Sequence, residues 1–247
     1  MRTILALASA AFLVVATNSR ADEPADLQKI VDKAIKAHGT PAAKNKATVS
    51  NMKGKFYGMG EGIDFTADLK TQDPGQTRMD LSLEVMGQTF EFIQTVNGDK
   101  GWKSLGGNVE DMSKEELEEA KEGVYADRLA RLISIKEKGY KLSSLGDKKI
   151  GERATVGIKV AHEGHRDVSL FFDKETGLLR MVERRGKDPA AGQEFNQETL
   201  YENYKGVDGV QQPHKVTINR DGKLFVEGEI SDFKRLEELD ASTFAKP

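Results

Sequence analysis

The segment from Val168 to Phe233 constrains the fold most, because apolar and polar residues alternate along several short runs that turns separate. Leu170 and Phe172 share one parity before a polar loop that ends at Gly177. Later runs of the same period end at Asp-Gly pairs, which favour tight hairpin turns. No helical pattern lies between these runs. The segment therefore predicts an antiparallel sheet, open or closed, built as a meander.

The same period of two recurs in the N-terminal half of the chain. In the run after Gly62, for example, Ile63, Phe65 and Ala67 alternate with polar residues, as in a half-buried strand. These strands place aliphatic and aromatic side chains on one side of a sheet and charged ones on the other. Further strands are expected over residues 52–57, 79–85, 90–92, around 102, 140–142 and 154–160.

Two segments carry helical spacing instead. The first has apolar residues three and four apart from Leu27 to Ile35 and ends at Gly39, with His38 predicted to have a capping or surface role in its last turn. The second starts at a capping box, Ser113-Lys114-Glu115-Glu116, and is expected to run for about five turns with a break near Gly123. Its apolar stripe consists of Leu117, Ala120, Val124, Leu129, Leu132 and Ile135. The natural place for such a stripe is the apolar face of a curved sheet.

The first residues have the form of an export signal. Arg2 gives a positive start, an apolar run extends from Ile4 to Val15, and small residues flank Arg20. We expect residues 1–21 to be a signal peptide cleaved after Ala21, and residues 22–247 to form a single domain. The apolar run is too short for a spanning helix, so the mature chain should be soluble, exported to the periplasm or an equivalent compartment, and without an integral membrane segment.

The composition limits the kinds of covalent chemistry and binding partner that this chain can have. The chain of 247 residues contains no cysteine, which excludes disulfides, thiol catalysis and a lipid-modified N-terminal cysteine. Without Arg2 and Arg20, the mature chain has 35 basic and 40 acidic residues, a formal charge of about −5. This balance argues against a nucleic-acid partner.

The sequence holds little that resembles catalytic machinery. It has no nucleophile elbow, phosphate loop or dinucleotide fingerprint. His162 and His165 could both reach one ion, but they lie three apart in a turn and no convincing third ligand is near. We expect a solvated turn there, and predict no catalytic residues, no metal site, no cofactor and no enzymatic activity.

A resemblance emerges from the order of several motifs. Gly101-Trp102 follows the Asn97-Gly98-Asp99 turn, Phe171-Phe172-Asp173-Lys174-Glu175-Thr176-Gly177 forms a hairpin, and Tyr204-Lys205-Gly206-Val207-Asp208-Gly209-Val210 precedes Pro213-His214-Lys215. With the N-terminal helix, the inserted helix and a closing Leu239-Asp240, this order resembles the superfamily of the periplasmic outer-membrane lipoprotein carrier and its receptor (LolA/LolB-like). The resemblance implies a mainly β (α+β) fold: one strongly curved antiparallel sheet, a half-barrel, with both helices on its concave face. This chain is longer than the typical carrier, and no arginine in it matches the family's latch for the lid helix.

The resemblance also implies a function. The concave face would hold acyl chains of a lipoprotein, a lipid or another amphiphile, under a lid helix that carries Leu117, Val124 and Leu132. The residues expected to line it are Leu83, Val85, Phe90, Phe92, Ile158, Leu170 and Phe172. An alternative is a non-catalytic structural or protein-interaction module of the envelope, in which the same residues fill a core. A third hypothesis is a hydrolase or metal protein that uses His162 and His165.

Overall fold

The computed structural model describes residues 24–41 and 44–247. Within them the chain forms two α-helices, a short 3₁₀ helix and fifteen strands. In chain order, the elements are α1 (Pro24–His38), β1 (Ala47–Phe56), β2 (Ile63–Gln72), β3 (Gln76–Val85), β4 (Gln88–Asn97), β5 (Lys100–Leu105), β6 (Asn108–Asp111), α2 (Lys114–Ala130), β7 (Lys141–Ile150), β8 (Arg153–Ala161), β9 (Val168–Asp173), β10 (Leu179–Lys187), β11 (Glu194–Glu202), β12 (Lys205–Val207), β13 (Val210–Gln212), β14 (Lys215–Arg220), β15 (Lys223–Leu236) and η1 (Ala241–Phe244).

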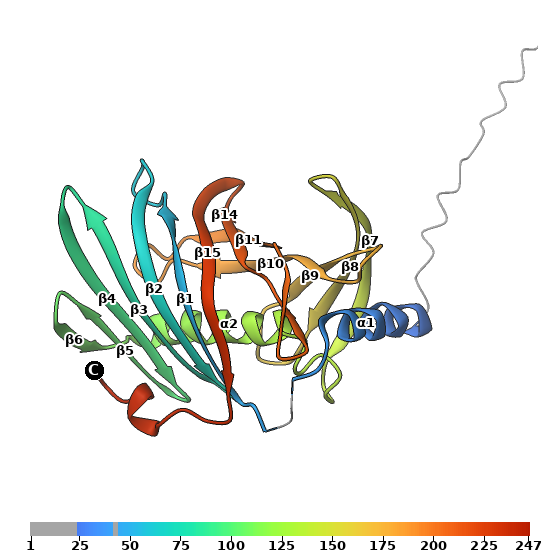
Figure 1. Cartoon of the computed structure of the whole chain (residues 1–247), viewed down its shortest axis with the longest axis horizontal. Helices are drawn as coiled ribbons and strands as arrows, with labels where there is room; N and C mark the ends of the chain where they lie inside the picture. Colours follow the sequence, from blue (N-terminus) through green and yellow to red (C-terminus); the bar gives the residue numbers. More distant parts are fainter. Residues whose placement is uncertain (1–23, 42–43) are drawn as a thin grey trace, which may run out of the picture.

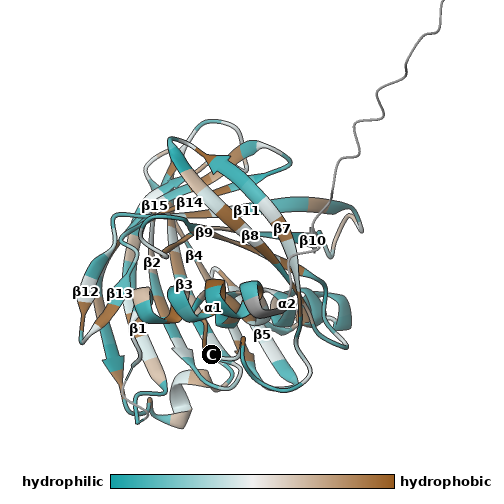
Figure 2. Cartoon of the chain, turned by 90° about the vertical axis from the view of Figure 1, so that its right-hand side faces the viewer, coloured by the Kyte–Doolittle hydropathy of each residue, from teal (hydrophilic) through white to brown (hydrophobic). Residues whose placement is uncertain are grey.

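Thirteen of the described strands form one antiparallel sheet in the order β6-β5-β4-β3-β2-β1-β15-β14-β11-β10-β9-β8-β7. The first and last parts of the chain meet at its centre, where β1 pairs with β15. The sheet is open, with β6 and β7 at its edges, and it arches around both helices (Figures 1 and 2). The predicted α+β half-barrel is confirmed.

Helix α1 forms where the apolar spacing predicts it. Leu27, Val31 and Ala34 are buried, and they join a core with side chains of β8, β9 and β10. The helix ends at His38. Gly39 follows it with a φ of +78°, which is readily adopted only without a side chain, and an added Cβ there would lie 2.2 Å from the carbonyl oxygen of Gly209.

The expected surface or capping role of His38 is wrong, because this last residue of α1 is buried against the sheet. Its Nε2 accepts a hydrogen bond of 3.2 Å from the backbone N–H of Leu179, so Nδ1 carries the proton and donates to the carbonyl of Ala34 at 2.8 Å. Burial lowers the pKa of His38. A neutral imidazole therefore ties the end of α1 to β10.

Helix α2 starts as predicted but ends earlier. Both capping-box bonds are present: the Ser113 hydroxyl accepts from the N–H of Glu116, and the Glu116 carboxylate accepts from the N–H of Ser113. The helix continues through Gly123 without the expected break and ends at Ala130. Leu132 therefore lies outside it, in a turn with φ of +57°, and contributes to the core from there.

The C-terminal tail folds back onto the sheet. Its helix η1 packs on β3 and β4, which lie inside the sheet: Phe244 is fully buried, and its carbonyl accepts a hydrogen bond from Asn97 Nδ2 at 3.1 Å. The proposed signal peptide lies outside the described residues. Among the described helices, none is long and apolar enough to cross a membrane.

Candidate functional site

Alternate residues of the strands supply the concave face, and a register shift between Leu179 and Met181 changes the parity within β10. On its C-terminal side the pairs Ile158–Leu170 and Leu170–Val182 face the helices. These residues belong to a filled core with Leu129 of α2 and Val31 of α1. On this side, therefore, the concave face is covered.

On the other side the concave face is hollow. A cavity of about 970 Å³ lies between α2, from Glu116 to Asp127, and strands from β2 to β6, with β10, β11 and β14 also contributing to its wall. Ligand cavities in proteins commonly measure ~300–1,000 Å³, so this one is large enough for a lipid chain. The apolar part of its lining consists of Leu69, Met79, Phe92, Leu105, Met112, Ala120, Val124, Pro189, Phe195 and Ile218.

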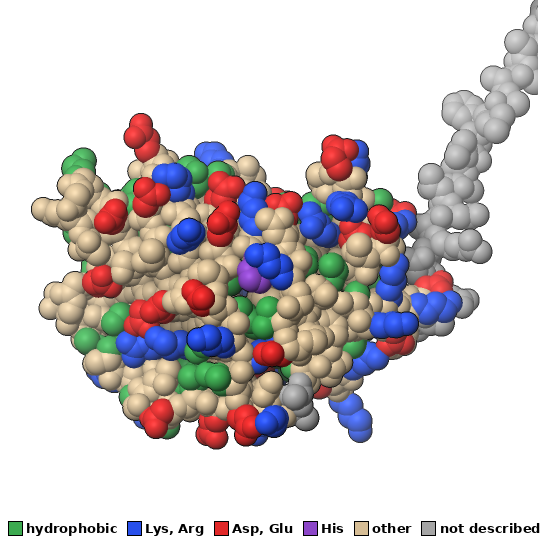
Figure 3. Space-filling model, viewed as in Figure 1, with side chains coloured by type: hydrophobic (Ala, Val, Ile, Leu, Met, Phe, Trp, Pro, Cys, Tyr) green, Lys and Arg blue, Asp and Glu red, His purple; other side chains and the backbone are tan. Residues whose placement is uncertain are grey.

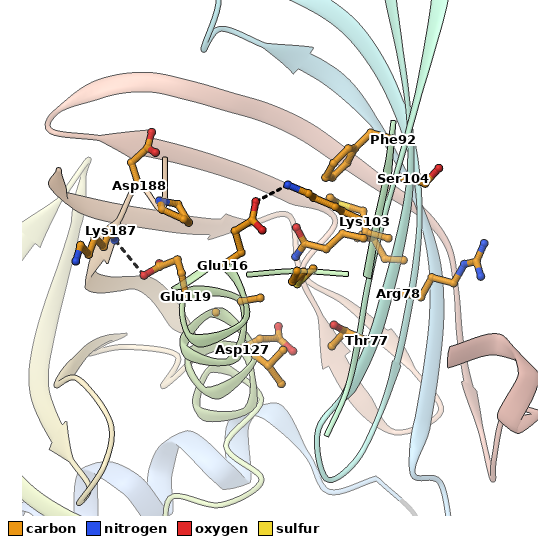
Figure 4. A pocket seen from close by; sticks show the side chains of 18 of the residues that line it. Thr77, Arg78, Phe92, Lys103, Ser104, Glu116, Glu119, Asp127, Lys187 and Asp188 are labelled. Atoms are coloured by element: carbon orange, nitrogen blue, oxygen red, sulfur yellow. Dashed lines mark hydrogen bonds and ion pairs between the residues drawn. The ribbon is translucent and has the colours of Figure 1, made fainter. Parts of the chain in front are cut away.

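Close to the helix, the cavity wall also carries charged side chains (Figure 4). Lys103 reaches from β5 to Glu116 of α2 with an Nζ–Oε1 distance of 2.6 Å. Glu119 and Asp127 extend from the same helix, whereas Arg78 is directed away from it. The cavity therefore combines an apolar wall with polar groups, as expected for a site that accepts an amphiphile.

The predicted lining residues fall into three groups. Phe92 lines the cavity. Leu83 pairs with Phe90, which is 45% exposed, and both continue this face toward the β3–β4 turn beside Val85. The remaining three, Ile158, Leu170 and Phe172, are fully buried in the core under the helices. Binding by any of these seven side chains stays a prediction.

The lid residues are divided in the same way. Val124 lines the cavity. Leu117 packs on β5 at Gly101, where an added Cβ would approach its Cδ1 to 2.9 Å. Leu132 lies beyond the C-terminal end of the helix, in the filled core.

The C-terminal half of the sheet holds α2 through Glu119. Its two carboxylate oxygens accept from Arg184 Nη1 at 2.8 Å and from Arg166 Nη1 at 2.6 Å, and one of them also accepts from the backbone N–H of Lys187. Burial opposes ionisation of Glu119, but these hydrogen bonds outweigh it and hold its pKa below the ordinary value. Glu119 is therefore a charged anchor of the helix.

A second anchor lies one turn further along α2. Glu122 accepts a hydrogen bond of 2.9 Å from His165 Nδ1 and another from the backbone N–H of Arg166. The His165 ring stacks on Tyr125 at 3.9 Å between centroids, and His162 packs on Tyr140 at 4.5 Å. The β8–β9 turn is present as predicted, but its histidines pack against α2 and its surroundings. No group of three metal-binding side chains occurs in the described part of the chain.

The N-terminal half of the sheet holds the other end of α2. Arg128 Nε and Arg131 Nη2 lie 3.3 and 3.6 Å from Asp73 Oδ1, in the turn between β2 and β3. These contacts are ion pairs by distance, although Arg128 Nε and Asp73 Oδ1 are not aligned as a hydrogen bond. Together with Lys103, they make α2 a bridge between the two halves of the sheet.

Sequence reasoning missed the arginines of this site. Arg184 follows Val182 at the inward parity of β10, and Arg220 follows Ile218 at that of β14. A charge at a position where the pattern requires an apolar residue is the signal that could have found them. On the outer face, by contrast, acidic and basic side chains are interspersed (Figure 3).

Comparison with known proteins places this architecture among solved folds. A LolA superfamily protein from Nitrosomonas europaea superposes with a TM-score of 0.56 at 11% identity, over 89% of this chain and 97% of that one. A putative outer membrane lipoprotein-sorting protein domain from Vibrio parahaemolyticus gives 0.54 at 13% identity, over 88% and 95%. A DUF1329 family protein from Desulfovibrio piger gives 0.52 at 11% identity, over 88% and 96%.

No family model matches the sequence, and no curated protein matches it either. The shared property is therefore the fold, which is LolA-like.

Proposed function

We propose that this protein is an exported binding protein that holds acyl chains, of a lipoprotein or of another amphiphile, in the cavity between α2 and the N-terminal half of the sheet. The observation that carries the proposal is the uneven filling of one concave face. The side toward β7 is packed by both helices, while about 970 Å³ remains open beside Phe92 and Val124.

The energetics of an acyl chain suit such a site. Each methylene removed from water contributes ~0.8 kcal/mol, so a chain that enters the cavity gains most of its affinity from the apolar wall. Charged side chains of α2 and β5 also line the cavity, so a headgroup there would lie beside polar groups. We further propose that an envelope protein delivers or receives the ligand. No step of this function needs a catalytic group.

Native mass spectrometry of the protein, expressed with its N-terminal segment and gently isolated, tests the proposal. We expect bound acylated species that organic extraction releases and identifies. Phe92→Asp should abolish their retention, because it places a charge in the apolar wall. Ile93→Asp is the matched control, since the adjacent residue of a strand faces the opposite side of the sheet.

A protein that carries nothing, and to which no lipophilic dye binds, would contradict the proposal. It would favour the structural or protein-interaction module instead, for which the filled core around Leu170 is the supporting observation.

A further inference from the structure

Arg220 is a cationic side chain on the wall of the cavity. It is the last residue of β14, and it shares the inward parity of Val216 and Ile218. Its guanidinium lies against two aromatic rings, with its Cζ 4.3 Å from the centroid of Phe195 and 3.7 Å from that of Phe225. The aromatic contacts fix the position of the charge.

The hydrogen-bonding capacity of this guanidinium is mostly unused. Nε donates to Gln197 Oε1 at 3.3 Å. Among the described residues, no carboxylate oxygen lies within 4.0 Å of Arg220, and its terminal nitrogens donate no hydrogen bond. These nitrogens are not fully buried, so they remain accessible. A partly buried arginine without a counter-ion can receive an anion.

The neighbouring acidic groups are engaged elsewhere. Glu119 accepts from both Arg184 and Arg166. Asp188 uses Oδ1 to accept the backbone N–H groups of Ala190 and Ala191. Burial and the nearby charge of Arg184 lower the pKa of Arg220, and the charges of Glu119 and Asp188 offset this only in part.

We propose that Arg220 binds the anionic headgroup of an amphiphile whose chain lies along the apolar wall of the cavity. The planar guanidinium can donate two parallel hydrogen bonds to a carboxylate or a phosphate. The ligand class is therefore an acidic lipid with a carboxylate or phosphate group, and neutral lipids of the same chain length bind less tightly. This inference rests on the proposed function and adds its headgroup specificity.

The experiment uses delipidated mature protein and displacement of a lipophilic dye by three single-chain ligands of equal length: palmitate, 1-palmitoyl-glycerol phosphate and neutral 1-palmitoylglycerol. We expect the two acidic ligands to bind about tenfold or more tightly than the neutral one. Arg220→Gln should remove this preference and leave binding of 1-palmitoylglycerol within about twofold. The relative affinity of palmitate and the phosphate ligand identifies which anionic group the site prefers.

Arg185→Gln is the matched control. It removes the same charge from the same part of the sheet, but its side chain is 69% exposed and pairs with Glu194. This variant should keep the preference for acidic ligands. A measurement on the unaltered protein avoids any effect of mutation on folding: raising the salt concentration should weaken binding of the acidic ligands and not that of the neutral one.

The outcomes separate the two proposals. Equal binding of all three ligands, with or without Arg220→Gln, would overturn the role of Arg220 and leave the acyl-binding function intact. If Arg220→Gln lost affinity equally for acidic and neutral ligands, Arg220 would serve only to pack Phe195 and Phe225. That result would also overturn its role in headgroup binding. Failure of every ligand to bind would contradict the proposed function itself.

Discussion

The two halves of the concave face are built from the same strand pattern and end in different states. Around Leu170, α1 and the C-terminal half of α2 supply enough apolar surface to fill the space above the sheet. Around Phe92 α2 is the one helix present, and its side chains at the cavity include Glu116 and Glu119, which pair with Lys103 and Arg184. The difference shows that the helices above the sheet decide whether an apolar face becomes a packed core or the wall of a cavity.

The largest effect is expected from truncating matched phenylalanines in the two halves. Phe172→Ala should lower the free energy of unfolding by about 3–5 kcal/mol, because it leaves a cavity in a packed core. Phe92→Ala, at the wall of an existing cavity, should cost only about 1 kcal/mol. Urea denaturation of the two variants measures both values. Equal losses would mean that the two halves are packed alike.

A smaller effect is expected from weakening the bridge across the halves. Glu119→Gln leaves Arg184 and Arg166 without their shared carboxylate and should destabilise the protein by about 2 kcal/mol, less than a fully buried pair would because all three side chains keep some exposure. Hydrogen exchange of α2 should rise in this variant.

The control for this change is Glu118→Gln on the exposed side of the same helix. Its side chain is 62% exposed and lies 3.8 Å from Lys114, so this variant should lose almost no stability. If the two glutamate variants exchanged at the same rate, Glu119 would not anchor the helix.

The smallest effect concerns pH and the end of α1 on the filled side. The pKa of His38 in the folded protein lies below its ordinary value of 6.5, so the unfolded chain takes up this proton first as the pH falls. The contribution of His38 to stability is therefore complete above pH 6.5 and declines as the pH drops toward the lowered value. Denaturation between about pH 7.5 and about pH 5.5 should show this decline, which His38→Gln should reduce.

His162→Gln, in the β8–β9 turn, removes another histidine and serves as the control. It should keep the decline seen in the unaltered protein. A His38→Gln variant with an unchanged pH dependence would show that another group is responsible.

Much of the fold could be predicted because its determinants are local. The alternation of Phe65 and Ala67 and the Asp-Gly turns define the strands, and the Ser113–Glu116 box marks the start of α2. The end of α2 was missed because Leu132 and Ile135 continue the apolar spacing beyond Ala130, where tertiary contacts, and not helical periodicity, place them in the core.

The candidate site was predictable only in part. The strand pattern gives the inward parity of Phe92, and the structure places Phe92 at the cavity. It gives the same parity to Ile158 and Phe172, which the structure buries. Periodicity cannot separate the two cases, because it specifies a face of the sheet and not what lies above it.

The sequence by itself therefore determined the strands, both helices, their amphipathic faces and, through the order of its motifs, the half-barrel. These properties depend on residues that are neighbours along the chain. Only the tertiary structure decided where the concave face stays open, that Arg184 and Arg166 bind Glu119, and that Arg220 faces the cavity without a counter-ion among the described residues. These properties arise between residues tens of positions apart, whose distances follow from the curvature of the sheet and the course of α2 across it.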